Sequence, residues 1–465
     1  MAEKKTHMQL FQPVDLTQGT CWKTILVFSL PVILSYLLQQ IYTISDAAIV
    51  GQTLTAQEVA GVNDTSSLVF IFLQFAFGVS AGFCVVTSCH VGAQDDRGVR
   101  RSLSTQIVLS AVLTVVLTAL ALALLNPMLA WINVTPADPE VYHAAYTYCF
   151  IIFVGIGAQM FYNFICSFLR SMGDSVTPLI FLLFSTVLNV GLDLLFILKF
   201  RWGVAGAAAA TVSAQLISTV GCFCYAFAHY PNIRLKKEDW HITMHDVRRH
   251  VSRGIPLGLQ FSVLAVGIIV MQGGVVQFDM RDGVMVSNAA QNGFGAANKL
   301  NNLVMTPMNA LGGAMTSFTA QNLGAGRKER IAAGFRTGMK MAVCVVVPFF
   351  LLYFFLGRQM LLLFMDDTGS DALKTGMEFL RIVTPFYFVV AVKLVADGVL
   401  RGAEQMRQFM LSTFTDLILR VILAYVFSAG MGARGIWLSW PFGWTIATVM
   451  SFVFYRRYTG KKAAL

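Results

Sequence analysis

Long apolar segments alternate with short polar segments along almost the entire chain. Each apolar segment has at least the ~20 residues that an α-helix needs to cross a bilayer. The pattern therefore predicts twelve transmembrane helices, numbered here in chain order. They fall at residues 22–50, 66–90, 103–126, 141–169, 178–200, 203–230, 254–279, 286–320, 336–357, 378–400, 408–430 and 433–455.

The composition is typical of a protein that lies mostly in lipid. Of its 465 residues, 56% are hydrophobic and 12% are charged, and the mean hydropathy is +0.66. Soluble domains carry about 25% charged residues. The eight cysteines lie mostly inside apolar segments and the seven histidines are scattered, so neither set has the paired spacing of a metal site. We therefore expect an all-α integral membrane protein without a cofactor.

Lysine and arginine are distributed unevenly between the predicted loops. Of the 34, 24 lie in the N-terminus, the loops after even-numbered helices and the C-terminus, whereas seven lie in the other loops. Cytoplasmic loops carry such an excess, so both termini are expected in the cytoplasm of a bacterial or archaeal cell, with the chain as a multi-pass protein of the cell membrane. The net charge of +10 then reflects topology, and nucleic acid is not an expected partner. A monomer is expected.

The two halves of the chain resemble each other. Leu30-Pro31 in the first helix corresponds to Ile255-Pro256 in the seventh, and three further short motifs recur at offsets of 229 to 232 residues. Because each half has six helices, both insert the same way up, as a parallel repeat with its axis along the membrane normal. Two such bundles facing each other predict the central cleft of an alternating-access carrier. The expected segments are a cytoplasmic N-terminal segment at 1–21, lobes at 22–230 and 254–455, a cytoplasmic linker at 231–253 and a cytoplasmic tail at 456–465.

Four polar residues of the first half interrupt the apolar segments at similar depth. Asp46 lies in the outer half of the first helix, Asn189 and Asp193 share one face of the fifth, and Thr211 lies in the sixth. At 1.5 Å per residue, they are about 8 to 15 Å below the outer surface. An Asp near the centre of a membrane helix costs roughly 2.5–3.5 kcal/mol and is a functional candidate by default. The alternative is that these groups only hold helices together.

Two carboxylates with an amide and a hydroxyl suit a small hard cation such as Na⁺, or a shared proton. The second half provides an internal comparison, because the corresponding positions contain no carboxylate. They are Met271, Arg420, Ala424 and Trp440. A structural brace would be expected in both halves, so the one-sided distribution favours a dedicated cation-coupling site.

Other charged residues inside the predicted helices have simpler interpretations. Asp416 and Arg420 are four residues apart and are expected to pair. Lys393, Asp397 and Arg401 form an i, i+4, i+8 series that ends at the cytoplasmic face, where pairing and snorkelling explain them.

Several residues are candidates for helix movement or for lining the cleft. Pro31 should kink the first helix, as either a static or a moving feature. Lys299 has no partner four residues away on its helix, so its role stays open between lining the cleft and pairing with another helix. Methionines offer an adaptable surface to bulky ligands, although core packing is their more common role. The candidate cleft-lining residues are Gln39, Tyr42, Met160, Met271, Lys299 and Met305.

These features are similar to those of the multidrug and toxic compound extrusion (MATE) family, along nearly the whole chain. The resemblance rests on twelve helices in two parallel halves and on the patterns LPVILSYLLQQIYTISDAAIVG, LRSMGDS and TAQNLGAGR. The cation-site pattern resembles the prokaryotic DinF-like branch, which has an Asp in helix 1, an Asn and an Asp four apart in helix 5, and a Thr in helix 6. The second-half acidic site of the NorM-like branch is missing, since helix 7 has no acid before Asp279 and Asp397 lies near the cytoplasmic side.

The resemblance implies a secondary active antiporter, not an enzyme, that exports amphipathic, cationic organic compounds in exchange for H⁺ or Na⁺ by alternating access. One alternative is a lipid-linked saccharide flippase of the same superfamily, which would need a basic central cavity; Lys299 is the one candidate for it. A more remote alternative is a membrane-embedded enzyme. It would need a catalytic cluster, such as His with carboxylates or Ser with Lys, and the sequence contains no such cluster.

Overall fold

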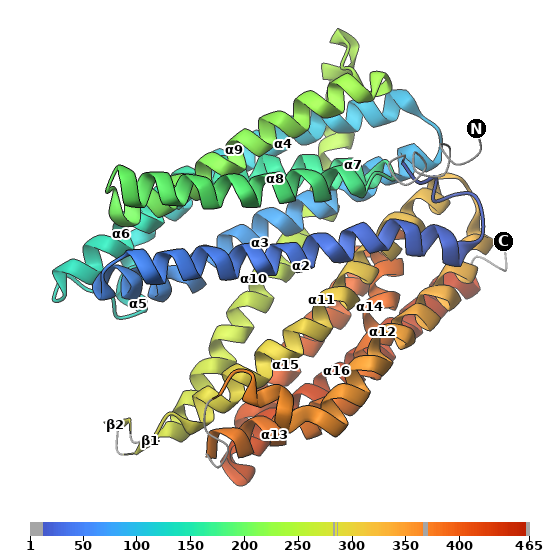
Figure 1. The fold of residues 1–465 in the computed structure, drawn as a ribbon. Helices are drawn as coiled ribbons and strands as arrows, with labels where there is room; N and C mark the ends of the chain where they lie inside the picture. The colour runs from blue at the N-terminus through green and yellow to red at the C-terminus, as the bar shows by residue number, and fades with distance from the viewer. Residues whose placement is uncertain (1–12, 282–283, 286, 366–370, 462–465) are drawn as a thin grey trace, which may run out of the picture. The chain divides into compact units, whose positions relative to one another are not determined.

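The chain folds almost entirely into helices, and within each half they run lengthwise beside one another (Figure 1). The structure is a computed structural model that describes residues 13–281, 284–285, 287–365 and 371–461. The predicted terminal segments 1–21 and 456–465 therefore lie partly outside the described residues. In the first half the helices are α2 (Cys21–Thr53), α3 (Ala56–Gly92), α4 (Asp96–Ala123), α5 (Leu125–Trp131), α6 (Pro139–Val154), α7 (Ile156–Ser171), α8 (Val176–Asp193), the π-helix η2 (Leu194–Lys199) and α9 (Gly203–His229).

Two short 3₁₀ helices, η3 (Pro231–Ile233) and η4 (Lys237–Trp240), connect the two halves. The second half contains α10 (Met244–Val276), η5 (Gln277–Asp279), α11 (Ala289–Gly324), α12 (Lys328–Leu362), α13 (Asp371–Val383), η6 (Thr384–Phe386), α14 (Tyr387–Gly402), α15 (Met406–Met431) and α16 (Ala433–Lys461). Strands β1 (Met280–Arg281) and β2 (Val284–Met285) form a small antiparallel pair between η5 and α11.

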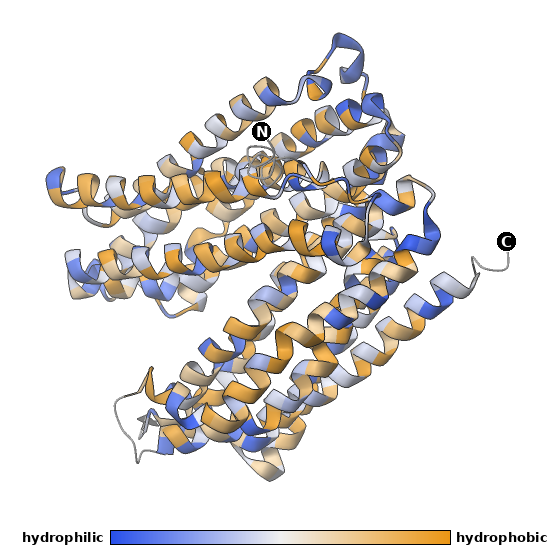
Figure 2. Ribbon diagram, turned by 45° about the vertical axis from the view of Figure 1, so that its right-hand side comes forward, coloured by the Kyte–Doolittle hydropathy of each residue, from blue (hydrophilic) through white to orange (hydrophobic). Residues whose placement is uncertain are grey.

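Ten described helices are long and apolar enough to cross a membrane, counting α8 with η2 and α13 with α14 as single spans. Helices α6 and α7 together form an eleventh, bent by 46°. The remaining predicted helix, the eighth at 286–320, corresponds to α11, whose 36 residues are long enough to span but include many polar side chains. Figure 2 shows apolar residues along most of each helix and hydrophilic residues gathered at helix ends and connections. The all-α membrane fold expected from the sequence is confirmed, and eleven of its twelve predicted spans are long and apolar enough to cross a membrane when the bent pair is counted as one.

The outward surface of these helices is apolar. On α4, Val112, Val115 and Val116 are 53%, 69% and 52% exposed, and on α8 Val187 is 66% exposed. A protein surrounded by water rarely leaves such continuous apolar surface uncovered. The same side chains are in their favoured environment when lipid tails surround the helix.

The chain forms two compact units, and their boundaries fall inside two helices. One unit contains Leu30–Ala265 with the described part of Met1–Leu16, and the other contains Thr17–Ser29 with Val266–Leu465. Helix α2 therefore passes from one unit to the other next to Pro31, and α10 does so after Ala265. Helix α2 is one continuous helix through Pro31, where the Ser35 hydroxyl donates to the Pro31 carbonyl at 2.8 Å.

The beginning of α10 belongs to the first unit because glycines bring it against α3. Gly78 and Gly82 on α3 are four residues apart, as are Gly254 and Gly258 on α10, and this spacing allows two membrane helices to approach closely. A Cβ added at Gly82 would lie 2.5 Å from the Arg253 carbonyl oxygen and 2.6 Å from the Gly254 Cα. Only hydrogen atoms fit at this crossing.

Helix α10 begins at Met244, well before its predicted start at residue 254. Its first turn carries a reciprocal cap, since the Thr243 N–H and hydroxyl donate to the Asp246 carboxylate and the Asp246 N–H donates to Thr243. This turn is polar, so hydropathy alone does not reveal it.

Candidate functional site

Two carboxyl groups meet inside the first unit. Asp46 lies in the second half of α2 and Asp193 is the last residue of α8; their carboxyl groups are close enough for one proton to bridge them. Asp193 is completely buried and Asp46 is half-buried. Both Asp193 oxygens and the Oδ1 of Asp46 are buried without a hydrogen-bond partner in the protein. Two buried carboxylates without donors are unfavourable, so the pair is suited to take up a proton or a cation.

The membrane span that contains Asp193 changes from an α-helix to a π-helix directly after this residue. Residues 176–193 are α-helical, and η2 continues the same span as a single π-helical stretch. A π-helical turn is wider than an α-helical one and occurs frequently at functional sites. Gly206 on α9 permits close packing here, since a Cβ at that position would lie 3.1 Å from the Phe196 backbone. The sequence gives no signal for this change of helix type.

Neutral oxygen and nitrogen atoms surround the carboxyl pair. Asn189, one turn before Asp193 on α8, is completely buried, and neither its Oδ1 nor its Nδ2 has a partner in the protein. Thr211 on α9 lies beside the Tyr42 hydroxyl, and Tyr42 in turn lies beside Asp46. The Tyr42 hydroxyl is also buried and accepts or donates no hydrogen bond that meets normal geometry. Oxygen atoms from α2, α8 and α9 are thus available to coordinate an ion.

Tyr148 on α6 lies within electrostatic range of the carboxyl pair, and the sequence does not single it out. Its side chain is near Asp46, Asp193 and Tyr42. It lies in an apolar segment that contains several other tyrosines, so no spacing distinguishes it.

The chemistry of the donor set selects against transition metals. Among the described residues, no group of three or more His, Cys, Asp or Glu side chains could hold a metal ion. With two carboxylates, an amide and hydroxyls, the ligands are all hard oxygens, as for Na⁺ or H⁺.

The other residues singled out in the sequence lie in varied surroundings. Met160 is completely buried in a core cluster with Ala76, Val79 and Phe83. Met271 is buried, Met305 is half-buried and Gln39 is exposed. Lys299 is exposed, with its Nζ 5.3 Å from the centre of the Phe364 ring.

In the second unit, the guanidinium-bearing Arg420 stands at the position that corresponds to Asn189 beside the carboxyl pair. The predicted pairing of Asp416 and Arg420 is present, with Nε to Oδ1 at 3.1 Å. The same guanidinium lies 5.3 Å from the ring centre of Trp440. Arg420 and Trp440 correspond in the repeat to Asn189 and Thr211. The second unit therefore holds its own covalently attached cation where the first unit offers free oxygen atoms.

The family model described as MatE matches residues 31–195 and 268–426, which together cover more than half of the chain. The chain belongs to the MatE family. It is therefore a membrane transporter and not an enzyme.

Two relatives match this chain over almost the whole length of both proteins. The probable multidrug resistance protein YpnP of Bacillus subtilis (strain 168) is 29% identical over 445 residues, which cover 95% of this chain and 96% of the relative. The FAD transporter of Shewanella oneidensis is 20% identical over 436 residues, or 90% and 91% of the two chains. A solved multidrug resistance MATE family transporter of the MOP superfamily, in an outward-facing conformation, has the same fold with a TM-score of 0.87 at 20% identity, over 98% of this chain and 99% of its own.

The two second-half acids of this MatE chain make local structural contacts. Asp279 is buried and accepts the N–H groups of Ala290 and Gln291 at 2.9 and 2.8 Å, so it caps the start of α11. Asp397 is buried and pairs with Lys393 at 2.7 Å while Ser451 donates to it at 2.6 Å. Both carboxylates thus have partners within the second unit, unlike Asp46 and Asp193.

Proposed function

We propose that this MatE transporter exports amphipathic, cationic organic compounds in exchange for H⁺ or Na⁺, and that the driving ion binds at Asp46 and Asp193 with Asn189 and Thr211. The observation that supports the site is the pair of adjacent carboxyl groups whose buried oxygens have no partner in the protein. The multidrug resistance proteins among its relatives support the substrate class. The assignment to the DinF-like branch remains part of this proposal.

Ion binding can drive transport only if the ion stabilises one conformation more than another. Here the two carboxyl groups come from different helices, α2 and α8. When both are ionised, their adjacent negative charges repel each other. A proton or Na⁺ removes that repulsion and favours the arrangement in which α2 lies against α8. Since α2 passes from one compact unit to the other next to Pro31, a shift of α2 reaches both units.

The proposal includes the orientation and setting of the chain. Both termini and the connection at 231–243 lie in the cytoplasm, the protein is a monomer, and it resides in the cell membrane. The uneven distribution of lysine and arginine supports this orientation.

Efflux from reconstituted vesicles tests the exchange reaction. Vesicles containing the protein are loaded with an amphipathic cationic dye, and an inward H⁺ gradient or an inward Na⁺ gradient is imposed separately. One of the gradients should accelerate efflux, and dissipation of that gradient by an ionophore should abolish the effect. Equal efflux rates with and without both gradients would contradict ion exchange. Gradient-driven transport of FAD with no transport of the dye would contradict the cationic substrate class.

Labelling of single cysteines tests the orientation. In a variant whose exposed Cys224 and Cys344 are replaced by Ser, a Cys is placed at exposed Ala137, before α6, or at exposed Lys237 in η4. A membrane-impermeant maleimide should label Ala137→Cys in intact cells and Lys237→Cys only after permeabilisation. The reverse result would invert the orientation.

A further inference from the structure

A basic pocket of about 380 Å³ opens in the first unit, between the end of α3 and the beginnings of α4 and α10. It is separate from the cation site, which lies near the other end of the membrane helices. Its lining includes three arginines and three histidines: Arg97, Arg101, Arg249, His90, His245 and His250. In the proposed orientation, on which this inference rests, the pocket lies at the cytoplasmic ends of these helices.

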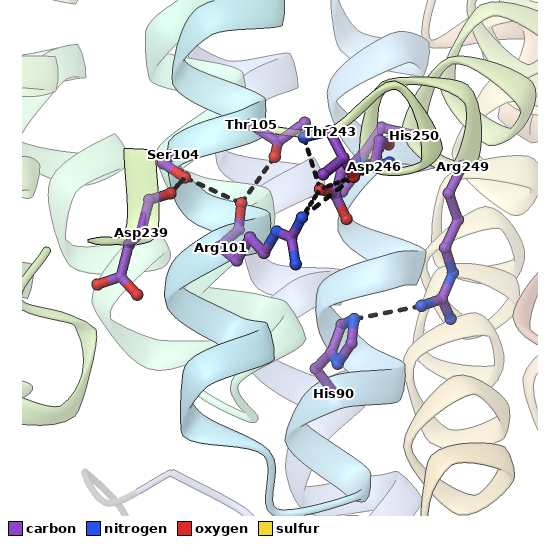
Figure 3. A network of polar contacts seen from close by, with 9 residues as sticks. All are labelled: His90, Arg101, Ser104, Thr105, Asp239, Thr243, Asp246, Arg249 and His250. Carbon is purple, nitrogen blue, oxygen red and sulfur yellow. Dashed lines mark hydrogen bonds and ion pairs between the residues drawn. The ribbon is translucent and has the colours of Figure 1, made fainter. Parts of the chain in front are cut away.

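The two carboxylates of the pocket are already satisfied by neighbouring groups. Asp95 caps α4 by accepting the Gly98 N–H at 2.8 Å, and it also contacts His90 at 3.0 Å. The Gly98 N–H is the main reason why the pKa of Asp95 lies below its usual value. Asp246 caps α10 and pairs with Arg101 at 2.7 Å (Figure 3). Because three arginines line the pocket beside only these two acids, both of which also serve helix starts, the pocket is net positive.

His90 makes hydrogen bonds with two charged residues of the pocket, Asp95 and Arg249. Arg249 can only donate, so its Nη1, 3.2 Å from the His90 Nε2, makes that nitrogen the acceptor (Figure 3). The proton of His90 is then on Nδ1, which donates to Asp95. His90 therefore bridges Asp95 and Arg249 and holds the Arg249 side chain at the pocket.

The inner wall of the pocket is a buried polar network in which each hydroxyl has a partner. His250, 1% exposed, donates from Nδ1 to the Asp246 carbonyl at 2.8 Å and accepts from the Ser102 hydroxyl at 2.8 Å. Ser102 accepts from Thr87 at 2.8 Å and from Gln106 at 3.0 Å. Because the network joins α3, α4 and α10, the wall is rigid and presents its cationic side chains without rearrangement.

We propose that this pocket binds a phosphate group, and that the group belongs to the headgroup of an acidic phospholipid in the cytoplasmic leaflet. Guanidinium groups recognise phosphate oxygens through paired hydrogen bonds, and the buried Nε of Arg101 has no partner in the protein. Basic pockets between membrane helices on the cytoplasmic side lie at the depth of lipid headgroups. The volume equals the liquid share of about thirteen water molecules, which is enough for a glycerophosphate.

A bound headgroup would hold α10 against α3 and α4 in the first unit. Helix α10 continues into the second unit after Ala265, so the lipid stabilises one end of a helix that both units share. Acidic lipid is thus expected to raise the thermal stability of the protein by mass action.

Lipid titration of the purified full-length protein tests the site. The thermal unfolding midpoint is measured at pH 7 in neutral detergent with increasing phosphatidylglycerol, with phosphatidylcholine, or with inorganic phosphate or glycerol 3-phosphate. Phosphatidylglycerol alone should raise the midpoint. Arg97→Gln and Arg249→Gln should each weaken its apparent affinity about fivefold, as expected for removal of one cationic side chain near a lipid headgroup. Arg248→Gln, an equal charge change at the neighbouring exposed position of α10 that is outside the pocket, is the matched control.

The outcomes separate the sources of the phosphate. A midpoint that rises with the soluble phosphates and not with the lipid would overturn the lipid source. No response to any phosphate compound, or equal weakening in Arg97→Gln and Arg248→Gln, would overturn the site. Because the measurement uses neither dye nor ion gradient, its failure leaves the cation site untouched, whereas failure of gradient-driven efflux leaves the lipid titration valid.

Discussion

Replacement of Asp193 by Asn is expected to reduce gradient-driven dye efflux about 100-fold, at the upper end of coupling free energies of about 1–3 kcal/mol. Asn has nearly the shape of Asp but cannot ionise, so it mimics a carboxyl group that can neither release a proton nor attract Na⁺. Asp46→Asn should have the same effect, because both residues form one pair. The initial rate of efflux from vesicles under the effective gradient is the measurement. Dye binding at equilibrium should change by less than about fivefold, since the pair binds the ion and not the dye.

Asp64→Asn is the matched control for this experiment. Asp64 lies on the exposed surface of α3 in the same unit, so the chemical change is identical while the cation site stays intact. Its efflux should equal that of the unaltered protein. If Asp193→Asn transports dye with the normal response to both gradients, the pair is structural and the coupling hypothesis is wrong.

Replacement of Gly82 by Ala is expected to lower stability markedly, by about 1–3 kcal/mol, because the new methyl group would overpack the contact between α3 and α10. Its Cβ would lie 2.5 Å from the Arg253 carbonyl oxygen, and backbone cannot yield as a side chain can. The thermal unfolding midpoint in detergent reports the change.

Gly313→Ala on α11 provides a control with the opposite expected sign. A Cβ added at Gly313 meets no atom within 4 Å, so the substitution only reduces the freedom of the unfolded chain and should stabilise by about 0.4–1 kcal/mol. Equal midpoints for the two variants would show that the crossing of α3 and α10 can relax and is not a close-packed contact.

The sequence predicts helices well here because lipid imposes one simple requirement, a long apolar stretch, on each of them. The prediction is less complete where local geometry decides. The pattern at 141–169 predicts one helix, yet the segment bends by 46° at Gly155, where a Cβ would collide with Val212. The segment at 378–400 contains the 3₁₀ turn η6, which begins at Thr384 and includes Pro385. Neither the bend at Gly155 nor the 3₁₀ turn is visible in a hydropathy pattern.

The residues of the proposed cation site can be named from the sequence because charged side chains in membrane helices are costly and therefore conspicuous. Their depth along each helix follows from the rise per residue, which is how Asp46 and Asp193 can be expected at the same level. Tyr148 could not be predicted, since a tyrosine in an apolar segment is not unusual. Its proximity to the Asp46–Asp193 pair depends on how α6 packs. The basic pocket cannot be predicted from the sequence either, because its side chains come from segments more than 140 residues apart. Taken singly, these side chains indicate only the topology.

The guanidinium of Arg420 has a consequence for how ion titrations of this protein should look. A cation fixed to the chain beside Asp416 and Trp440 has a very high effective concentration, which dissolved ions cannot match. Raising the Na⁺ or H⁺ concentration will not displace it, so that position stays saturated under all conditions that keep the fold intact. A saturation curve for the driving ion should therefore describe a single class of sites, although the fold contains the corresponding position twice.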